Sequence, residues 1–324
     1  MLDDPSTLHA RDPEGLLEAL TRLPSRVGTP DRPRPSPIGF DATGATAVLV
    51  PVLAPWVDGR LVAGGTQILV DGGFQSDDVA VWRLAAEASG SEVVFLGAPG
   101  DADDDVAAAL GVTKPAPDVV LEDGPVVAFD VVRLIAHAAG RHEDVARLER
   151  ALTEVATACA PSVATEHNPA KTLAWRLYQR IPLLIAPRGA AALQGWVQQV
   201  FARVGKVLAV PTGDHPSLVA ASAFEARHAL ADDLVALVLG AEDAETRIVA
   251  EVLETRAADL ERLTLGAGGW PASLEDPVLD AILVAYAATW AAAYVALLGE
   301  LDPSRPGVYD AVRAAAAAEA RAGR

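Results

Sequence analysis

The sequence predicts an α/β protein with two domains, each built around a mostly parallel sheet. The chain has 324 residues, which is enough for two domains that each bury a core. Segment 66–96 is typical of a strand, a polar loop, a helix and a second strand, which together make a βαβ crossover unit. Segment 168–210 repeats the alternation as helix, strand, helix and strand. Two α/β halves therefore follow one another along the chain.

Composition and charge limit the kinds of molecule that the protein is expected to bind. The chain has 44 acidic and 26 basic residues and a formal net charge of −18. Such a surface repels phosphate backbones, so we expect no binding to nucleic acid or to anionic membranes. Cys159 is the only cysteine, which excludes an internal disulfide and a thiolate zinc cluster. A reducing cytoplasm fits this cysteine content, and the first residues lack the apolar core of a secretory signal.

The N-terminal half is predicted to form a domain of residues 1–142. Its expected elements are an amphipathic helix at 12–23, a proline-rich connection at 24–37, strands at 66–70 and 91–96, and helices at 79–88 and 125–139. The loop 97–105 contains four aspartates, but their spacing does not match a calcium loop. We therefore expect no metal site in this half.

The C-terminal half is predicted to form a domain of residues 143–324. Asn168 is a favourable N-cap for a helix, and Pro169 follows at the first helical position. The other expected elements are strands at 181–186, 207–210 and 234–239, and helices at 145–158, 190–204, 217–228 and 245–262. In the last of these helices we expect Ile248, Val252 and Leu253 to face the core.

A long apolar segment, 281–298, contains no charged residue in 18 positions. This length is near the threshold for a membrane span. The segment is rich in alanine and also contains three aromatic residues and Thr289. We therefore expect a helix that is buried at a domain or subunit interface, and no membrane span.

The loop that follows the strand at 207–210 is the best candidate for a functional loop. It begins after Pro211 and reads Thr-Gly-Asp-His, ending at His215. Polar loops at the carboxyl ends of parallel strands are where α/β proteins place their chemistry. His215 is therefore a candidate functional residue, and an ordinary loop residue is the alternative.

Four motifs of this half resemble the C-terminal half of the bifunctional phosphoglucose/phosphomannose isomerases. They are Asn-Pro-Ala-Lys at 168–171, Pro-Arg-Gly at 187–189, the helix that carries Trp196, and the loop from Pro211 to His215. That family is built from two sugar isomerase (SIS) domains. The resemblance implies two three-layer α/β/α domains with flavodoxin-like, doubly wound sheets. It also implies a sugar phosphate ligand, no cofactor, no metal, and a homodimer whose subunits share the site.

The resemblance assigns roles to individual positions. His215 matches the histidine that opens the sugar ring, and Arg313 matches a lysine of the final helix. In the N-terminal half, phosphate-binding positions are matched by Thr43, Gly73 and Ser76.

The family's catalytic base is missing at the matching position. Ala202 stands where the family has a glutamate, and alanine cannot abstract a proton. Glu166 and Asp214 are possible substitutes, although a capping residue and a loop-surface residue are the simpler interpretations.

Three functions are compatible with this pattern. The first is an active phosphosugar isomerase with relocated catalytic groups. The second is an SIS-domain sensor or regulator that binds a sugar phosphate or nucleotide sugar without turnover. The third is a ligand-free structural dimer partner. The loss of the glutamate and of most phosphate-binding hydroxyls favours the second.

Overall fold

The chain packs as two compact units. A computed structural model describes residues 2–26, 38–42, 47–60, 62, 66–70, 88–97, 119–120, 126–213, 233–255, 259–304, 308, 312 and 315. We call the unit made of Met1–Asp31 and Arg141–Pro303 the α12 unit, after its central helix. The unit made of Arg32–Gly140 and Ser304–Arg324 is called the β1 unit.

These units differ from the predicted domains 1–142 and 143–324 at both ends of the chain. The N-terminal helices α1 (Pro5–Arg11) and α2 (Leu16–Arg22) belong to the α12 unit. Helix α2 buries Leu16, Leu17 and Leu20 and contacts α7 and α12. Burial of these leucines explains why the first residues pack with the C-terminal half.

The β1 unit contains a four-stranded parallel sheet with the order β1-β2-β3-β4. Its described elements are β1 (Ile38–Ala42), α3 (Leu49–Leu53), the 3₁₀ turn η3 (Ala54–Trp56), β2 (Thr66–Val70), β3 (Glu92–Gly97), β4 (Val119–Val120) and α6 (Val127–Ala138). Strands β2 and β3 pair in parallel as predicted. The predicted helix 79–88 lies largely outside the described residues.

The α12 unit contains the second sheet and most of the described helices. After α1, α2 and the 3₁₀ turn η1 (Leu23–Arg26) come α7 (His142–Cys159), the 3₁₀ turn η4 (Thr165–His167), α8 (Pro169–Leu177), β5 (Ile181–Ile185), α9 (Ala191–Val200), the π-helix η5 (Phe201–Gly205), β6 (Val210–Pro211), β7 (Leu234–Leu239), α11 (Ala244–Glu254), β8 (Asp259–Leu263) and α12 (Pro277–Leu298). The predicted cap is confirmed, because the Asn168 side chain accepts a hydrogen bond from the amide of Lys171.

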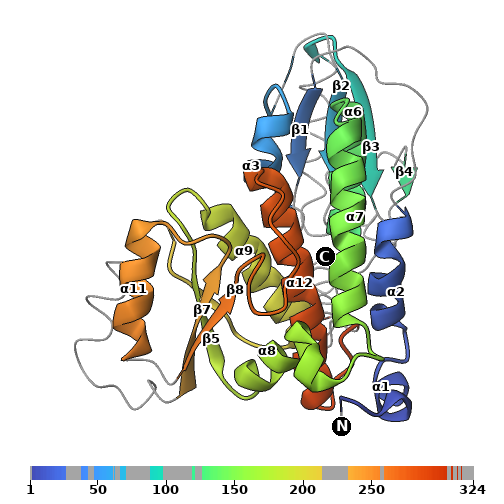
Figure 1. The fold of residues 1–324 in the computed structure, drawn as a ribbon. Helices are drawn as coiled ribbons and strands as arrows, with labels where there is room; N and C mark the ends of the chain where they lie inside the picture. Colours follow the sequence, from blue (N-terminus) through green and yellow to red (C-terminus); the bar gives the residue numbers. More distant parts are fainter. Residues whose placement is uncertain are drawn as a thin grey trace. The chain divides into compact units, whose positions relative to one another are not determined.

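The second sheet has the order β6-β5-β7-β8, and all its strands are parallel. Helix α11 lies on one side of the sheet, and α8, α9 and α12 lie on the other (Figure 1). Strand β7 is an unbroken apolar run, Leu-Val-Ala-Leu-Val-Leu, as expected for a parallel strand covered on both faces. The α/β class with parallel sheets and SIS-type layers is therefore confirmed.

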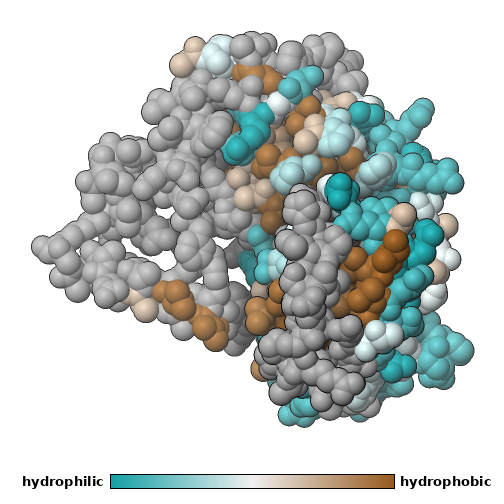
Figure 2. Space-filling view, turned by 90° about the vertical axis from the view of Figure 1, so that its left-hand side faces the viewer, coloured by the Kyte–Doolittle hydropathy of each residue, from teal (hydrophilic) through white to brown (hydrophobic). Residues whose placement is uncertain are grey.

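The predicted helix 245–262 is wrong in its second half, and of its three predicted core-facing residues only Leu253 is confirmed. Helix α11 ends at Glu254, and residues 259–263 form the edge strand β8. Ile248 and Val252 are 62% and 39% exposed, whereas Val249 and Leu253 are buried. In Figure 2 the left-hand side of Figure 1, where α11 lies, faces the viewer. Hydrophobic residues, in brown, are visible on the surface of this side. The burial of Val249, Ala250 and Leu253 against the sheet sets the rotation of the helix.

The predicted buried strand 207–210 is also largely wrong. Only Val210 and Pro211 pair with β5, and Leu208 is 66% exposed. Lys206 has a positive φ of 57° and ends the π-helix η5. The chain therefore begins to pair with β5 only at Val210.

Helix α12 is the core of its unit. It is long and apolar enough to cross a membrane, but 94% of its most apolar window is buried inside the chain. It contacts α2, α7, α8, α9 and β8, which cover it from several sides. A helix that is hydrophobic all round belongs in such a core. The helix therefore needs no partner subunit to bury it, and it no longer supports a dimer.

Candidate functional site at the carboxyl edge of the second sheet

The strand order places a switch point between β5 and β7. From β5 the chain continues to β6 on one side, and from β7 it continues to β8 on the other. The ends of the strands are level, since Ile185 pairs with Val238 and Leu239 pairs with Leu263. In open parallel sheets, ligands bind outside the carboxyl ends of the strands at such a point. The loops after β5 and β7 therefore define the candidate site.

The loop after β5 brings Arg188 to the site. Gly189 has a φ of 86°, a conformation that favours glycine and turns the chain into α9. The backbone amide of Arg188 donates to Asp243 Oδ2 at 3.4 Å. The Nη2 atom of the Arg188 side chain donates to Glu245 Oε2 at 3.0 Å. The Arg188 side chain is 67% exposed, so the guanidinium group faces solvent beside the switch point.

The loop after β7 brings Asp243 to the same edge. Its Oδ1 accepts from the amide of Thr246 at 2.7 Å and caps the start of α11. This backbone hydrogen bond is the main reason that the pKa of Asp243 lies below its ordinary value. Asp243 is therefore a fixed carboxylate that joins the Arg188 loop to α11.

A second ion pair extends the polar edge toward β8. Glu242 Oε1 lies 2.7 Å from Arg262 Nε, and Thr264 donates its hydroxyl to the Gly240 carbonyl at 3.0 Å. The side chains described at this edge thus include three carboxylates, Glu242, Asp243 and Glu245, and two guanidinium groups, Arg188 and Arg262. Such a mixture of hydrogen-bond acceptors and donors suits the hydroxyl groups of a sugar. Its net negative charge does not favour a phosphate group.

The start of the predicted functional loop is held by Gln194 of α9. Gln194 is fully buried, and its Nε2 donates to the Gly213 carbonyl at 3.0 Å. Its Oε1 accepts from the Gly213 amide at 2.9 Å. Thr212 donates its amide and its hydroxyl to the Leu184 carbonyl at 3.1 and 2.9 Å. The segment that leads to Asp214 and His215 therefore leaves the sheet from a fixed point.

Of the predicted site residues, the structure describes only Glu166. Glu166 is exposed in the 3₁₀ turn η4, directly before α8. Pro169 at the start of α8 lies beside Gly269 of the loop that follows β8, so this end of α8 is on the carboxyl side of the sheet. Thr43, Gly73, Ser76, Asp214, His215 and Arg313 lie outside the described residues.

The structure describes Ala202, the position that the family resemblance assigns to the base. Ala202 is exposed and lies within the π-helix η5, six positions after Trp196 and three after Gln199. Single π-turns inside helices often occur at functional sites. The methyl group at this position nevertheless has no proton to give or take.

Arg188 and Gln194 were not predicted as site residues. Arg188 lies in the Pro-Arg-Gly motif directly after a strand, a position that could have identified it. A glutamine in the first turns of an apolar helix gave no comparable signal. Within the part of the chain that the structure describes, no group of three His, Cys, Asp or Glu side chains is arranged to hold a metal ion.

Two family profiles match the chain. The phosphoglucose isomerase N-terminal domain matches residues 16–140, and the bacterial phospho-glucose isomerase C-terminal SIS domain matches residues 166–315. A search of curated protein sequences found no match.

Solved structures with the same fold include a glucose-6-phosphate isomerase like protein from Thermus thermophilus. It is 26% identical, with a TM-score of 0.77, and the match covers 96% of this chain and 98% of that one. A glucosamine-6-phosphate deaminase from Thermotoga maritima is 11% identical, with a TM-score of 0.54 and coverage of 93% and 96%. The C-terminal domain of glucosamine-fructose-6-phosphate aminotransferase from Francisella tularensis is 9% identical, with a TM-score of 0.50 and coverage of 90% and 96%. The last two show the fold alone. The two profiles together span most of the sequence, and the chain therefore belongs to the phosphoglucose isomerase family, with a C-terminal SIS domain of the bacterial type.

Proposed function

We propose that the protein binds a sugar phosphate or a related carbohydrate derivative and does not isomerise it. The observation that carries this proposal is the polar edge at the switch point between β5 and β7. There, Arg188, Asp243 and Glu245 are held together by hydrogen bonds of 3.0 and 3.4 Å. A preformed set of fixed donors and acceptors is the kind of surface that orients sugar hydroxyls.

The proposal assigns the sugar hydroxyls to the edge of the α12 unit, because the described charges there are mixed. Separately, the family resemblance assigns phosphate binding to Thr43, Gly73 and Ser76, and catalytic positions to His215 and Arg313.

The absence of turnover is proposed from the identity of Ala202. Aldose–ketose isomerisation of glucose 6-phosphate or mannose 6-phosphate to fructose 6-phosphate moves a proton between adjacent carbons, and this step requires a base. By the family resemblance, Ala202 of η5 stands at the base position, and an alanine supplies no base.

An active isomerase is the second candidate, and Glu166 supports it. This carboxylate is exposed in η4 at the carboxyl side of the sheet, and Asp214 follows the fixed Gly213. Either residue is a possible substitute base.

The proposal also includes two further features. The protein is a homodimer with a shared site, and its location is cytoplasmic. Light scattering on the purified protein tests the dimer.

A thermal-shift titration combined with an isomerase assay on the same sample separates these functions. The ligands are glucose 6-phosphate, fructose 6-phosphate, mannose 6-phosphate and inorganic phosphate. Ligand binding raises the melting temperature by mass action. A shift without turnover is expected. Turnover that His215→Ala abolishes would establish the isomerase instead, and Glu166→Gln and Asp214→Asn would then identify the base. No shift with any ligand would leave the ligand-free dimer partner.

A further inference from the structure

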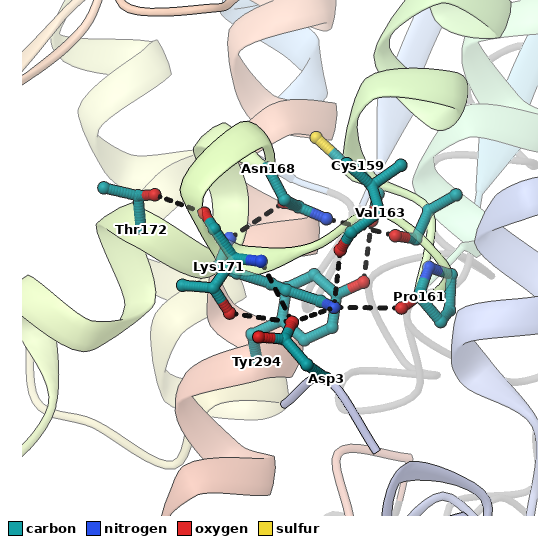
Figure 3. Close-up of polar contacts among 10 residues, drawn as sticks. Asp3, Cys159, Pro161, Val163, Asn168, Lys171, Thr172 and Tyr294 are labelled. Carbon is teal, nitrogen blue, oxygen red and sulfur yellow. Dashed lines mark hydrogen bonds and ion pairs between the residues drawn. The ribbon is translucent and has the colours of Figure 1, made fainter. Parts of the chain in front are cut away.

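Lys171 is a charged side chain in the core that the proposed function does not use. Its side chain is 0% exposed, although lysine is seldom fully buried without a partner. Its Nζ donates to the carbonyls of Pro161 and Val163 at 2.9 and 2.7 Å and to Asp3 Oδ1 at 3.0 Å. Figure 3 shows this ammonium group at the centre of the three acceptors. All three N–H donors of the ammonium group are therefore used.

One oxygen of Asp3 receives three hydrogen bonds at once. Besides Lys171, the amide and the hydroxyl of Thr165 both donate to Asp3 Oδ1, each at 2.9 Å. The donors come from η4 and α8, more than 160 positions away in the sequence. A buried ammonium, a backbone N–H and a hydroxyl that converge on one oxygen form a typical carboxylate site.

Neighbouring residues of this site are held by hydrogen bonds that do not involve Asp3. Asn168 caps α8 and donates its Nδ2 to the Ala160 carbonyl at 3.1 Å, which fixes the loop between α7 and α8. The Tyr294 ring of α12 lies 5.7 Å from Lys171 Nζ, and its hydroxyl donates to the Cys159 carbonyl at 2.7 Å. Asp3 itself is 50% exposed and belongs to the segment before α1. The Lys171 donor is thus built into the core, whereas the Thr165 donors lie in η4 and the acceptor Asp3 lies in the segment before α1.

We propose that Lys171 and Thr165 form a carboxylate-binding site that the chain fills with its own Asp3. The N-terminal segment acts as an intramolecular ligand. At the other end of this segment, Arg11 donates to the Leu297 carbonyl of α12 at 3.0 Å and to Glu300, just after α12, at 2.7 Å. When Asp3 is removed, a small free carboxylate such as acetate takes its place. This inference does not depend on the proposed function, because it involves none of the sugar-binding residues.

Rescue of Asp3→Ala by acetate tests the proposal on the full-length protein. Loss of the carboxylate leaves the Lys171 ammonium without a counter-charge, so we expect the melting temperature to fall by about 5 °C. Acetate is expected to restore it with a saturable dose dependence, and chloride at the same ionic strength is not. Hydrogen exchange at the Thr165 amide is expected to accelerate in the variant and to slow again with acetate.

Asp4→Ala is the matched control, since it removes the same charge from the next residue. Asp4 caps α1 by accepting from the amide of Ser6 at 3.0 Å, so this variant is also destabilised, but acetate is not expected to rescue it. If Asp3→Ala does not fold in buffer, acetate is expected to restore folding, and Asp3→Asn provides a milder variant for the same titration. An unchanged melting temperature in Asp3→Ala, or an effect of acetate no larger than that of chloride, would overturn the proposal.

Discussion

The Asp3 carboxylate, bound to a fully buried ammonium, makes stability depend on pH. The pKa of Asp3 lies below its ordinary value, chiefly because Lys171 donates a hydrogen bond to it. Since the folded-state pKa is below the unfolded one, the stabilisation is complete above the unfolded pKa of about 4 and is lost as the pH falls through the folded pKa.

We therefore expect the melting temperatures of the wild type and Asp3→Asn to differ at about pH 6 and to converge as the pH falls below the folded-state pKa of Asp3. In a Lys171→Met background, Asp3→Asn should have a smaller effect at pH 6, because only the two hydrogen bonds from Thr165 to Asp3 remain. A difference between the wild type and Asp3→Asn that persists unchanged at low pH would contradict this account of the ion pair.

Cys159 offers a second test at the same scale. Its side chain is 0% exposed, and burial raises the pKa of its thiol well above the ordinary range. Iodoacetamide at pH 8 should therefore leave the native protein unlabelled, while the protein in denaturant is labelled at one site. Labelling of the native protein as fast as of the unfolded protein would show that the α7 terminus is open.

The sequence predicted helix caps better than it predicted hydrogen-bond partners that are distant along the chain. Asn168 and Pro169 identified the start of α8 because a cap depends on neighbouring residues. The bond between Lys171 and Asp3 could not be predicted in this way, because 168 positions separate the two residues. The same limit applies to Arg188 and Glu245, which only the pairing of β5 with β7 brings together.

Helix α11 shows how a single element is oriented by what it covers. Val249 is 3% exposed and packs in the cluster with Leu183 and Val238, whereas its neighbour Ile248 is 62% exposed. The apolar spacing of the segment allowed either face to be buried, and the sheet selected the one with Val249, Ala250 and Leu253.

A pair of substitutions in α11 tests this orientation by urea unfolding. Val249→Ala is expected to lower the free energy of unfolding by about 1–3 kcal/mol, because it leaves a cavity against the sheet. Ile248→Ala, one position earlier, should change it by no more than about 0.5 kcal/mol. The reverse order of effects would mean that Ile248 faces the core, as the sequence alone suggested.

Across the whole molecule, the fold was more predictable than the site. Alternating apolar segments and the family motifs identified the parallel sheets and the SIS architecture, since these depend on patterns spread over many residues. The assignment of residues 1–31 to the α12 unit was missed, because a short amphipathic helix carries no information about which core it covers.

The packing of the first residues leads to a prediction for a truncated chain. Removal of residues 2–26 should destabilise the α12 unit strongly, since Leu16, Leu17 and Leu20 leave the surfaces of α7 and α12 uncovered and Lys171 loses Asp3. Thermal unfolding of the truncated and full-length chains, at equal concentration, measures the loss. An unchanged unfolding temperature would mean that the N-terminal helices do not stabilise this core.

The most direct test of the central claim is a calorimetric titration of the wild type, Arg188→Ala and Arg150→Ala with fructose 6-phosphate and glucose 6-phosphate. Arg150 lies on α7, where its Nε donates to the Ala146 carbonyl, so its variant matches the charge change outside the sheet. Saturable binding is predicted for the wild type and for Arg150→Ala. A loss of about tenfold or more is predicted for Arg188→Ala, because hydrogen bonds from a charged donor to the sugar disappear. No binding by the wild type, or equal affinity in all three proteins, would contradict a carbohydrate site at the carboxyl edge of this sheet.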